Sequence, residues 1–136
     1  MTTNLIGTLK EHTNYVSSVA FNTSNILASG SWDTTIKLWN ISTMTCIETL
    51  KGHIHNVWSV AFNGAGNMLA SGSDDHTIKL WDISTMTCVG TLEGHTAYVN
   101  SVVFNGDGLL ASGSSDKTIK LWNRFTMNCN RETWCD

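Results

Sequence analysis

One sequence pattern, Leu-Ala-Ser-Gly-Ser-x-Asp-x-Thr-Ile-Lys-Leu-Trp, occurs three times in this chain of 136 residues. The copies end at Trp39, Trp81 and Trp122, so they lie 42 and 41 residues apart (81 − 39 and 122 − 81). A period of this length indicates one structural unit repeated in tandem. A residue that recurs in every unit is therefore expected to hold that unit together rather than to perform chemistry.

The middle repeat is predicted to contain short strands joined by tight turns. The first strand is expected at 56–62, where side chains alternate and apolar groups fall on both faces. Three further strands are expected at 68–73, 77–81 and 87–92. Asn, Gly and Asp favour turns between the first three strands, at 63–66 and 74–76. Each repeat should therefore be a four-stranded antiparallel sheet without a helix.

The apolar residues on both faces indicate how such sheets are arranged. Each small sheet must be covered on both sides, and identical neighbours are the simplest cover. Radial stacking of four-stranded sheets gives a β-propeller. The sequence therefore predicts an all-β chain with three four-stranded antiparallel blades, forming a single domain over residues 1–136.

The two ends of each repeat resemble the WD40 repeat family. In the middle copy, Gly52 and His53 open the repeat, Asp75 lies six residues before Trp81, and Asp82 follows that tryptophan. The resemblance implies WD40 β-propeller blades. The three repeats are expected at about 8–48, 49–90 and 91–134.

Each repeat contains His, Ser and Asp, a combination that in a single copy could suggest a nucleophilic triad. The set occurs in all three copies, and the family resemblance implies a structural hydrogen-bond relay that also includes the tryptophan indole. Its expected members are His12, Asp33, Trp39, His53, Asp75, Trp81, His95, Asp116 and Trp122. The serine of each relay is left open between Ser29 or Ser31, Ser71 or Ser73, and Ser112 or Ser114. We therefore expect no catalytic residues and no enzyme activity.

Three blades are too few for a closed propeller, which has about four to eight. Residues 4–9 align with the fourth strand at 87–92, whereas the apolar pattern of that strand is lost at 129–134. We expect residues 4–9 of one subunit to complete the last blade of the next. A dimer would then have six blades and a trimer nine. The alternative is that the chain is a fragment of a larger WD40 scaffold protein.

The family resemblance places a partner-binding surface on the top face, at positions shortly after the repeat histidine and just before the turn Asp. In this chain those positions hold Tyr15, Trp32, Asn56, Trp58, Asp74, Tyr98 and Asn100, with Ser17 and Ser115. Tyr and Trp are enriched at binding hot spots. We therefore expect a non-catalytic scaffold that binds a protein or peptide, acting as a symmetric oligomeric propeller. A propeller that binds a glycan or another small ligand is the alternative.

Composition restricts the remaining classes of function. A net charge of −3 and a pI of about 5.9 argue against nucleic-acid binding, which requires clustered Lys and Arg. No zinc-type spacing, membrane span or signal peptide is present, so we expect no metal, no cofactor, no membrane partner and a cytoplasmic protein. Cys46, Cys88 and Cys129 follow the repeat and should be free thiols, whereas a Cys129–Cys135 bridge is left open.

Overall fold

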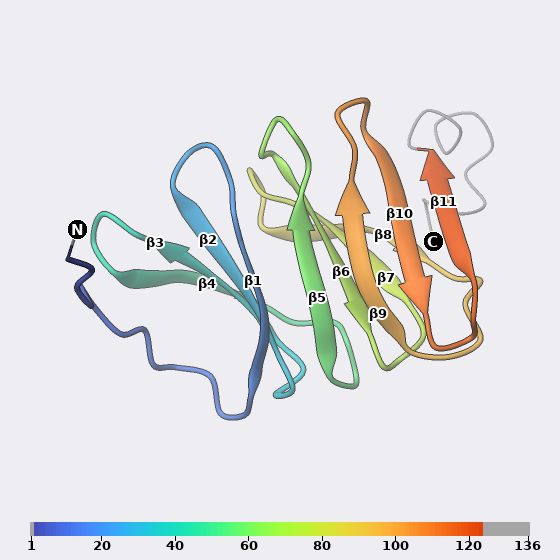
Figure 1. The fold of residues 1–136 in the computed structure, drawn as a ribbon, viewed down its shortest axis with the longest axis horizontal. Helices are drawn as coiled ribbons and strands as arrows, with labels where there is room; N and C mark the ends of the chain where they lie inside the picture. The colour runs from blue at the N-terminus through green and yellow to red at the C-terminus, as the bar shows by residue number, and fades with distance from the viewer. Residues whose placement is uncertain (1, 124–136) are drawn as a thin grey trace.

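The computed structural model describes residues 2–123, which form eleven β-strands in three antiparallel sheets (Figure 1). The first sheet contains β1 (Val16–Phe21), β2 (Ile26–Ser31), β3 (Ile36–Asn40) and β4 (Thr45–Leu50). The second contains β5 (Val57–Phe62), β6 (Met68–Ser73), β7 (Ile78–Asp82) and β8 (Thr87–Leu92). The third contains β9 (Val99–Phe104), β10 (Leu109–Ser114) and β11 (Ile119–Asn123). We call these sheets the first, second and third blades.

Each blade is a simple meander in which every strand pairs with the next one along the chain. The first strands of the blades, β1, β5 and β9, lie side by side, and the three sheets fan out from them (Figure 1). The all-β prediction is confirmed, as are the strands expected at 68–73 and 87–92. Within residues 2–123 the third blade has three strands, so its expected fourth strand stays a prediction. The weakened strand at 129–134, Cys129 and Cys135 lie outside the described residues.

The turn between the second and third strands of each blade is fixed by its aspartate. In the second blade, Asp75 Oδ1 accepts hydrogen bonds from the backbone N–H and the hydroxyl of Thr77, at 2.9 and 2.6 Å. The intervening His76 has a φ of 73° and its N–H donates to Ser73 O at 3.2 Å. The short polar side chain of Asp75, bonded to the backbone two residues on, stabilises this left-handed turn around a residue other than glycine.

Neighbouring blades pack through the small residues of the Ser-Gly-Ser segment. A Cβ atom on Gly30 would lie 2.8 Å from Val57 Cγ1, and one on Gly72 would lie 2.7 Å from Val99 Cγ1. Any larger residue at either position would therefore push the blades apart. Val57 and Val99 are both fully buried in the resulting core.

Backbone groups also cross each blade junction. Val60 N–H donates to Ser18 Oγ at 3.1 Å between the first and second blades. The equivalent Val102 N–H donates to Ser59 Oγ at 3.2 Å between the second and third. The two junctions are therefore copies of one interface, as the repeated sequence requires.

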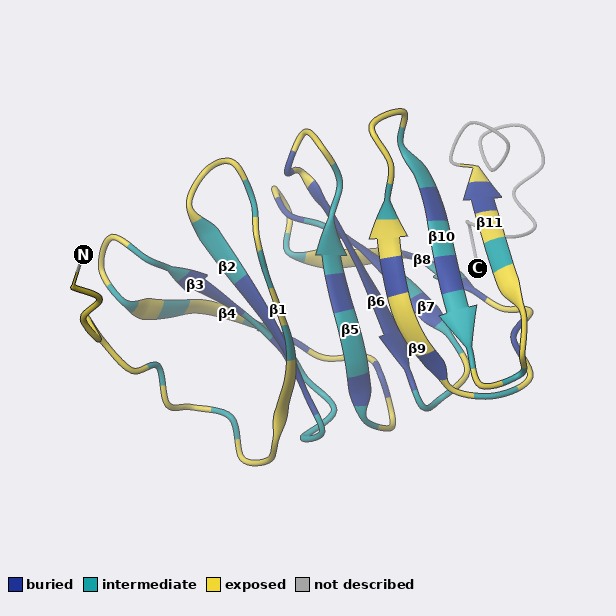
Figure 2. Cartoon of the chain, in the orientation of Figure 1, coloured by how far each residue is buried: buried dark blue, intermediate teal, exposed yellow. Residues whose placement is uncertain are grey.

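The two outer faces of the fan lack this cover (Figure 2). On β1, Val19 is 61% exposed, whereas its counterpart Val60 on β5 is 5% exposed. On β11, Ile119 is 77% exposed, whereas its counterpart Ile78 on β7 is fully buried. A Cβ atom on Gly113 would meet nothing within 4 Å. Both ends of the fan therefore present uncovered halves of the internal blade junction.

Residues 4–9 form no strand in the single chain. Leu5 and Ile6 are 85% and 87% exposed, and this segment lies at the end of the fan opposite β11 (Figure 1). The expected pairing of 4–9 with the last blade therefore does not occur within one chain.

Candidate partner-binding face

A buried hydrogen-bond chain runs through each blade. In the second blade, His53 Nδ1 lies 2.7 Å from Asp75 Oδ2 and His53 Nε2 lies 2.7 Å from Ser71 Oγ. The indole N–H of Trp81 donates to the same Ser71 Oγ at 2.9 Å. The side chains of His53, Ser71 and Trp81 are all buried. Four residues from four segments of the blade are thereby joined.

The protons of this chain follow from the charge on its carboxylate. Burial alone would raise the pKa of Asp75, but hydrogen bonds from His53 and Thr77 outweigh it and hold the pKa well below its usual range. The ionised Asp75 only accepts, so His53 Nδ1 carries a proton and donates it. The other ring nitrogen, Nε2, is then placed to accept the Ser71 O–H, and Ser71 accepts the Trp81 N–H. Every polar group of this hydrogen-bond chain therefore has a partner.

The same chain occurs in the other two blades with nearly identical distances. His12 and His95 each lie 2.7 Å from a serine Oγ, on Ser29 and Ser112 respectively. The indoles of Trp39 and Trp122 donate to these serines at 2.9 Å. The remaining members are Asp33, 2.8 Å from His12, and Asp116, 2.7 Å from His95.

In each repeat two serines were candidates for this hydrogen-bond chain, and the first of them is the one that takes part. The second, such as Ser73, instead accepts the N–H of Asp75 at 3.1 Å and donates to His55 O at 3.3 Å. The hydroxyl of Ser71 is fully enclosed and engaged by both His53 and Trp81. Its geometry is that of a structural bridge, with no path by which a substrate could reach it.

These hydrogen bonds hold two loops together at one end of each blade. Asp75 Oδ2 also accepts the N–H of Ile54, in the loop before β5, at 3.3 Å. A backbone bond then joins the same loop to the β6–β7 turn, from Asp74 N–H to Asn56 O at 2.9 Å. Equivalent bonds of 2.9 Å join Trp32 to Tyr15 and Ser115 to Tyr98. We call this end of the three blades the loop-end face.

All the residues expected in a binding surface lie on the loop-end face or at its margin, and three aromatic ones are in contact. The ring centroids of Tyr15 and Trp32 are 4.9 Å apart, and those of Trp32 and Trp58 are 5.3 Å apart. The indole N–H of Trp58 in turn donates to Asp74 Oδ1. We call Tyr15, Trp32 and Trp58 the aromatic run. It crosses the junction between the first and second blades.

The remaining expected residues lie farther along the same face. Asn100 Nδ2 donates to Ser115 Oγ at 3.1 Å within the third blade. Tyr98 is 47% exposed, and its ring centroid lies 6.3 Å from that of His76 in the second blade. Asn56 contributes its backbone carbonyl to the bond with Asp74. The aromatic run and this second group are therefore separate parts of one face.

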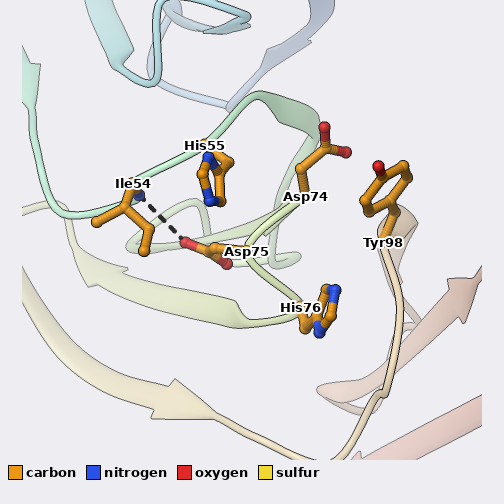
Figure 3. A pocket seen from close by; sticks show the side chains of 6 residues that line it. All are labelled: Ile54, His55, Asp74, Asp75, His76 and Tyr98. Atoms are coloured by element: carbon orange, nitrogen blue, oxygen red, sulfur yellow. Dashed lines mark hydrogen bonds between the residues drawn. The ribbon is translucent and has the colours of Figure 1, made fainter.

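A hollow of about 360 Å³ lies between the second and third blades on this face (Figure 3). It is lined by Ile54, His55, Asp74, Asp75, His76 and Tyr98. Asp74 and Tyr98 were predicted to lie in a binding surface, whereas His55 and His76 were not. Their occurrence in a single repeat each was the one signal that could have drawn attention to them.

Comparison with known proteins identifies the repeats. The family model for the WD domain, G-beta repeat, matches residues 3–40, 44–82 and 86–123, which is most of the chain. The chain belongs to the WD40-repeat family. WD40 domains generally serve as scaffolds for protein interaction, and the three matched segments each contain one of the hydrogen-bond chains described above.

Curated relatives match parts of this WD40 chain. The WD repeat-containing protein pop1 of Schizosaccharomyces pombe is 40% identical over 58 residues, 43% of this chain and 7% of that protein. Coatomer subunit beta'-1 of Arabidopsis thaliana is 42% identical over 59 residues, 41% of this chain and 6% of that protein. Phospholipase A-2-activating protein of Xenopus laevis is 47% identical over 53 residues, 39% and 6% respectively. The matched segments thus span less than a tenth of each relative.

Residues 2–123 contain no group of three or more His, Cys, Asp or Glu side chains arranged to hold a metal ion. In the same part of the chain, no helix has the length and apolar character needed to cross a membrane.

Proposed function

We propose that this WD40 chain is a non-catalytic scaffold that binds a segment of a partner protein across its loop-end face. The observation that carries the proposal is the aromatic run. Trp32 stands at a position occupied by Asp74 and Ser115 in the other blades, and Trp58 at one occupied by Ser17 and Asn100. The other blades form with small polar residues at these positions, so the fold does not require either tryptophan.

The exposure of the run suits binding. Tyr15 is 68% exposed, and Trp32 and Trp58 are half-buried against each other. Large rings held by neighbours lose little side-chain freedom when a partner covers them. Trp and Tyr accordingly dominate the binding energy of many protein interfaces. The coatomer subunit among the relatives is, by its name, part of an assembly, which agrees with a scaffold role.

We further propose that a second copy of the chain covers the open faces, giving a symmetric oligomeric propeller. Support comes from the complementarity of the two ends. The β1 face carries exposed Val16 and Val19, whose counterparts on β5 and β9 are buried at the internal junctions, and exposed Phe21, whose counterparts are half-buried. Ser101 stands where Ser18 and Ser59 accept a backbone N–H from the next blade. Val19 N–H of one copy would donate to Ser101 Oγ of another.

Residues 4–9 fit the open edge of β11 in such an assembly. In the second blade, Leu92 pairs with Ile78 and Thr91 with Lys79, and Lys79 Nζ donates to Thr91 Oγ1 at 3.0 Å. Leu9 and Thr8 lie three and four residues before His12, as Leu92 and Thr91 do before His95. The equivalent pairing would set Leu9 opposite Ile119 and Thr8 opposite Lys120. A fourth strand from the second copy would therefore reproduce both the pairing and the Lys–Thr hydrogen bond. Two copies give six blades and three give nine.

The free thiols of the described chain agree with the cytoplasm as the site of action. Cys46 and Cys88 form no disulfide, and Cys88 is exposed. Exposed free thiols persist where the compartment is kept reducing.

A peptide array probed with the purified chain tests the binding proposal, with a glycan array beside it. Trp58→Ala should abolish most binding to the peptide array while leaving the thermal unfolding midpoint close to that of the unchanged protein. Ile47→Ala is the control, because Ile47 is also exposed (43%) but lies on β4, outside the aromatic run. Peptide binding unchanged by Trp58→Ala, or selective binding to glycans, would contradict the proposal.

A further inference from the structure

The lining of the hollow between the second and third blades has a distinct charge. It lies where the loop before β5, the β6–β7 turn and the loop before β9 meet (Figure 3). Two carboxylates, those of Asp74 and Asp75, line it, and none of its lining residues is Lys or Arg. A ligand of positive charge would therefore be favoured there.

Only one of the two carboxylates has capacity left for a ligand. Asp75 is occupied on both oxygens, by Thr77 on Oδ1 and by His53 and Ile54 on Oδ2. Asp74 accepts the indole N–H of Trp58 on Oδ1, and its Oδ2 accepts no hydrogen bond from residues 2–123. Asp74 is thus oriented by one neighbour and open on the other side.

An aromatic wall faces this carboxylate. Tyr98 is 47% exposed and comes from the third blade, and Figure 3 shows its ring beside Asp74 at the rim of the hollow. The neighbouring His76 ring is tilted by 46° to that of Tyr98, with centroids 6.3 Å apart. A flat cation can lie against such a ring while its N–H groups reach the carboxylate.

The site is particular to one junction of the fan. The position of Asp74 is held by Trp32 in the first blade and by Ser115 in the third, and that of His76 by Thr34 and Lys117. The three turns share the same backbone, with φ of 75°, 73° and 74° at Thr34, His76 and Lys117. The repeat scaffold therefore requires neither Asp74 nor His76.

We propose that this hollow binds an arginine side chain of the partner protein, with the guanidinium donating to Asp74 and lying against Tyr98. Arginine suits the site better than lysine, because its planar group can stack on a ring and form two parallel hydrogen bonds to one carboxylate. The proposal rests on the loop-end face being the binding surface, and it assigns the charge and shape of one anchoring residue.

Three pentapeptides provide the probes: acetyl-Gly-Ser-Arg-Ser-Gly-amide, the same peptide with neutral citrulline in place of arginine, and the same peptide with lysine in that place. Each is titrated into the ¹⁵N-labelled full chain, and the Trp58 indole resonance is followed because that N–H is bonded to Asp74. The arginine peptide should shift this resonance saturably. The citrulline and lysine versions should bind more weakly, the former by on the order of tenfold, which is the worth of a hydrogen bond to a charged group.

Asp74→Ser is the decisive variant, because it copies the third blade, where Ser115 occupies the same turn with the same backbone bond. It should weaken the arginine peptide by on the order of tenfold, whereas Asp107→Ser, which removes one carboxylate from the distant β9–β10 turn, should not. Tyr98→Ala tests the wall without touching Trp58 and should also weaken binding. Equal binding of the arginine and citrulline peptides, or full binding by Asp74→Ser, would overturn the proposal.

The outcomes separate this proposal from the one on which it rests. If array peptides depend on Trp58 but bind Asp74→Ser unchanged, the loop-end face stands and the arginine site fails. If the arginine peptide depends on Asp74 while Tyr15→Ala and Trp32→Ala change no binding at all, the arginine site stands and the aromatic run fails.

Discussion

Replacing Ser71 with alanine tests the buried hydrogen-bond chain most sharply. Ser71 Oγ is the only described partner of the Trp81 indole N–H, and it also forms the 2.7 Å hydrogen bond with His53 Nε2. Alanine removes both bonds and leaves two polar atoms enclosed, since His53, Ser71 and Trp81 are each at most 6% exposed. Each unsatisfied buried group costs about 1–3 kcal/mol, so Ser71→Ala should lower the free energy of unfolding by about 2–6 kcal/mol.

That loss is large relative to the total stability of a small domain, about 5–15 kcal/mol. Urea unfolding followed by tryptophan fluorescence, at one fixed protein concentration, measures it. Ser24→Ala is the control, because Ser24 is exposed in the β1–β2 turn and its hydroxyl has no partner among the described residues. The control should change the free energy of unfolding by no more than about 0.5 kcal/mol.

A double-mutant cycle with Trp81→Phe isolates the serine–indole bond. Phenylalanine lacks the N–H donor, so in the double variant one of the two orphaned atoms is absent. The double variant should therefore be more stable than the sum of the single effects predicts, by about 1–3 kcal/mol. If Ser71→Ala lowers the free energy of unfolding by less than about 1 kcal/mol, or if the single effects are additive, the hydrogen-bond chain does not hold the blade together.

Three further predictions follow from the packing, the loop-end face and the carboxylates. Gly72→Ala should cost about 1–3 kcal/mol in urea unfolding, because its Cβ would lie 2.7 Å from Val99 Cγ1, whereas Gly113→Ala should leave the single chain intact and reduce assembly measured by light scattering. Trp32→Phe should not destabilise the fold and should raise its thermal midpoint, since Trp32 Nε1 is buried without a hydrogen-bond partner in the described chain; a fall of several degrees would contradict this. The lowered pKa of Asp75 stabilises the fold above its unfolded value near pH 4, so stability should fall as the pH drops further, and Asp75→Asn should flatten that dependence; parallel pH profiles would disprove it.

The strands could be predicted from the sequence because their signals are local. Alternation and turn residues located the strands at 68–73 and 87–92 without error, and the third strand of that blade was displaced by one residue, to Ile78–Asp82. Each repeat has the same signals, so the strands predicted for the middle repeat could be expected in the other two blades as well.

The serine of the hydrogen-bond chain could not be predicted, because Ser71 and Ser73 are two residues apart and lie on the same face of one strand. Periodicity cannot separate them. The choice depends on strand pairing, which sets Ser71 opposite Lys79 and brings the Trp81 indole to Ser71 rather than to Ser73.

Contacts between blades were equally beyond sequence reasoning. Trp32 and Trp58 were each placed on the face, but their contact depends on how the β2–β3 turn of one blade meets the start of β5 in the next. The hollow required His55 and His76, from two loops of the second blade, to meet Tyr98 from the third. Such groupings arise from the angle between sheets, which no local pattern specifies.

We propose that copies of this chain complete one another's blades and so build a closed binding platform. Light scattering behind a size-exclusion column measures the mass of the particle directly. The chain is 14.9 kDa, so we expect a discrete species at 29.8 kDa for a dimer or 44.7 kDa for a trimer (2 × 14.9 and 3 × 14.9). A stable species at 14.9 kDa, or a continuous range of larger masses, would contradict it and would point instead to blades supplied by a longer chain.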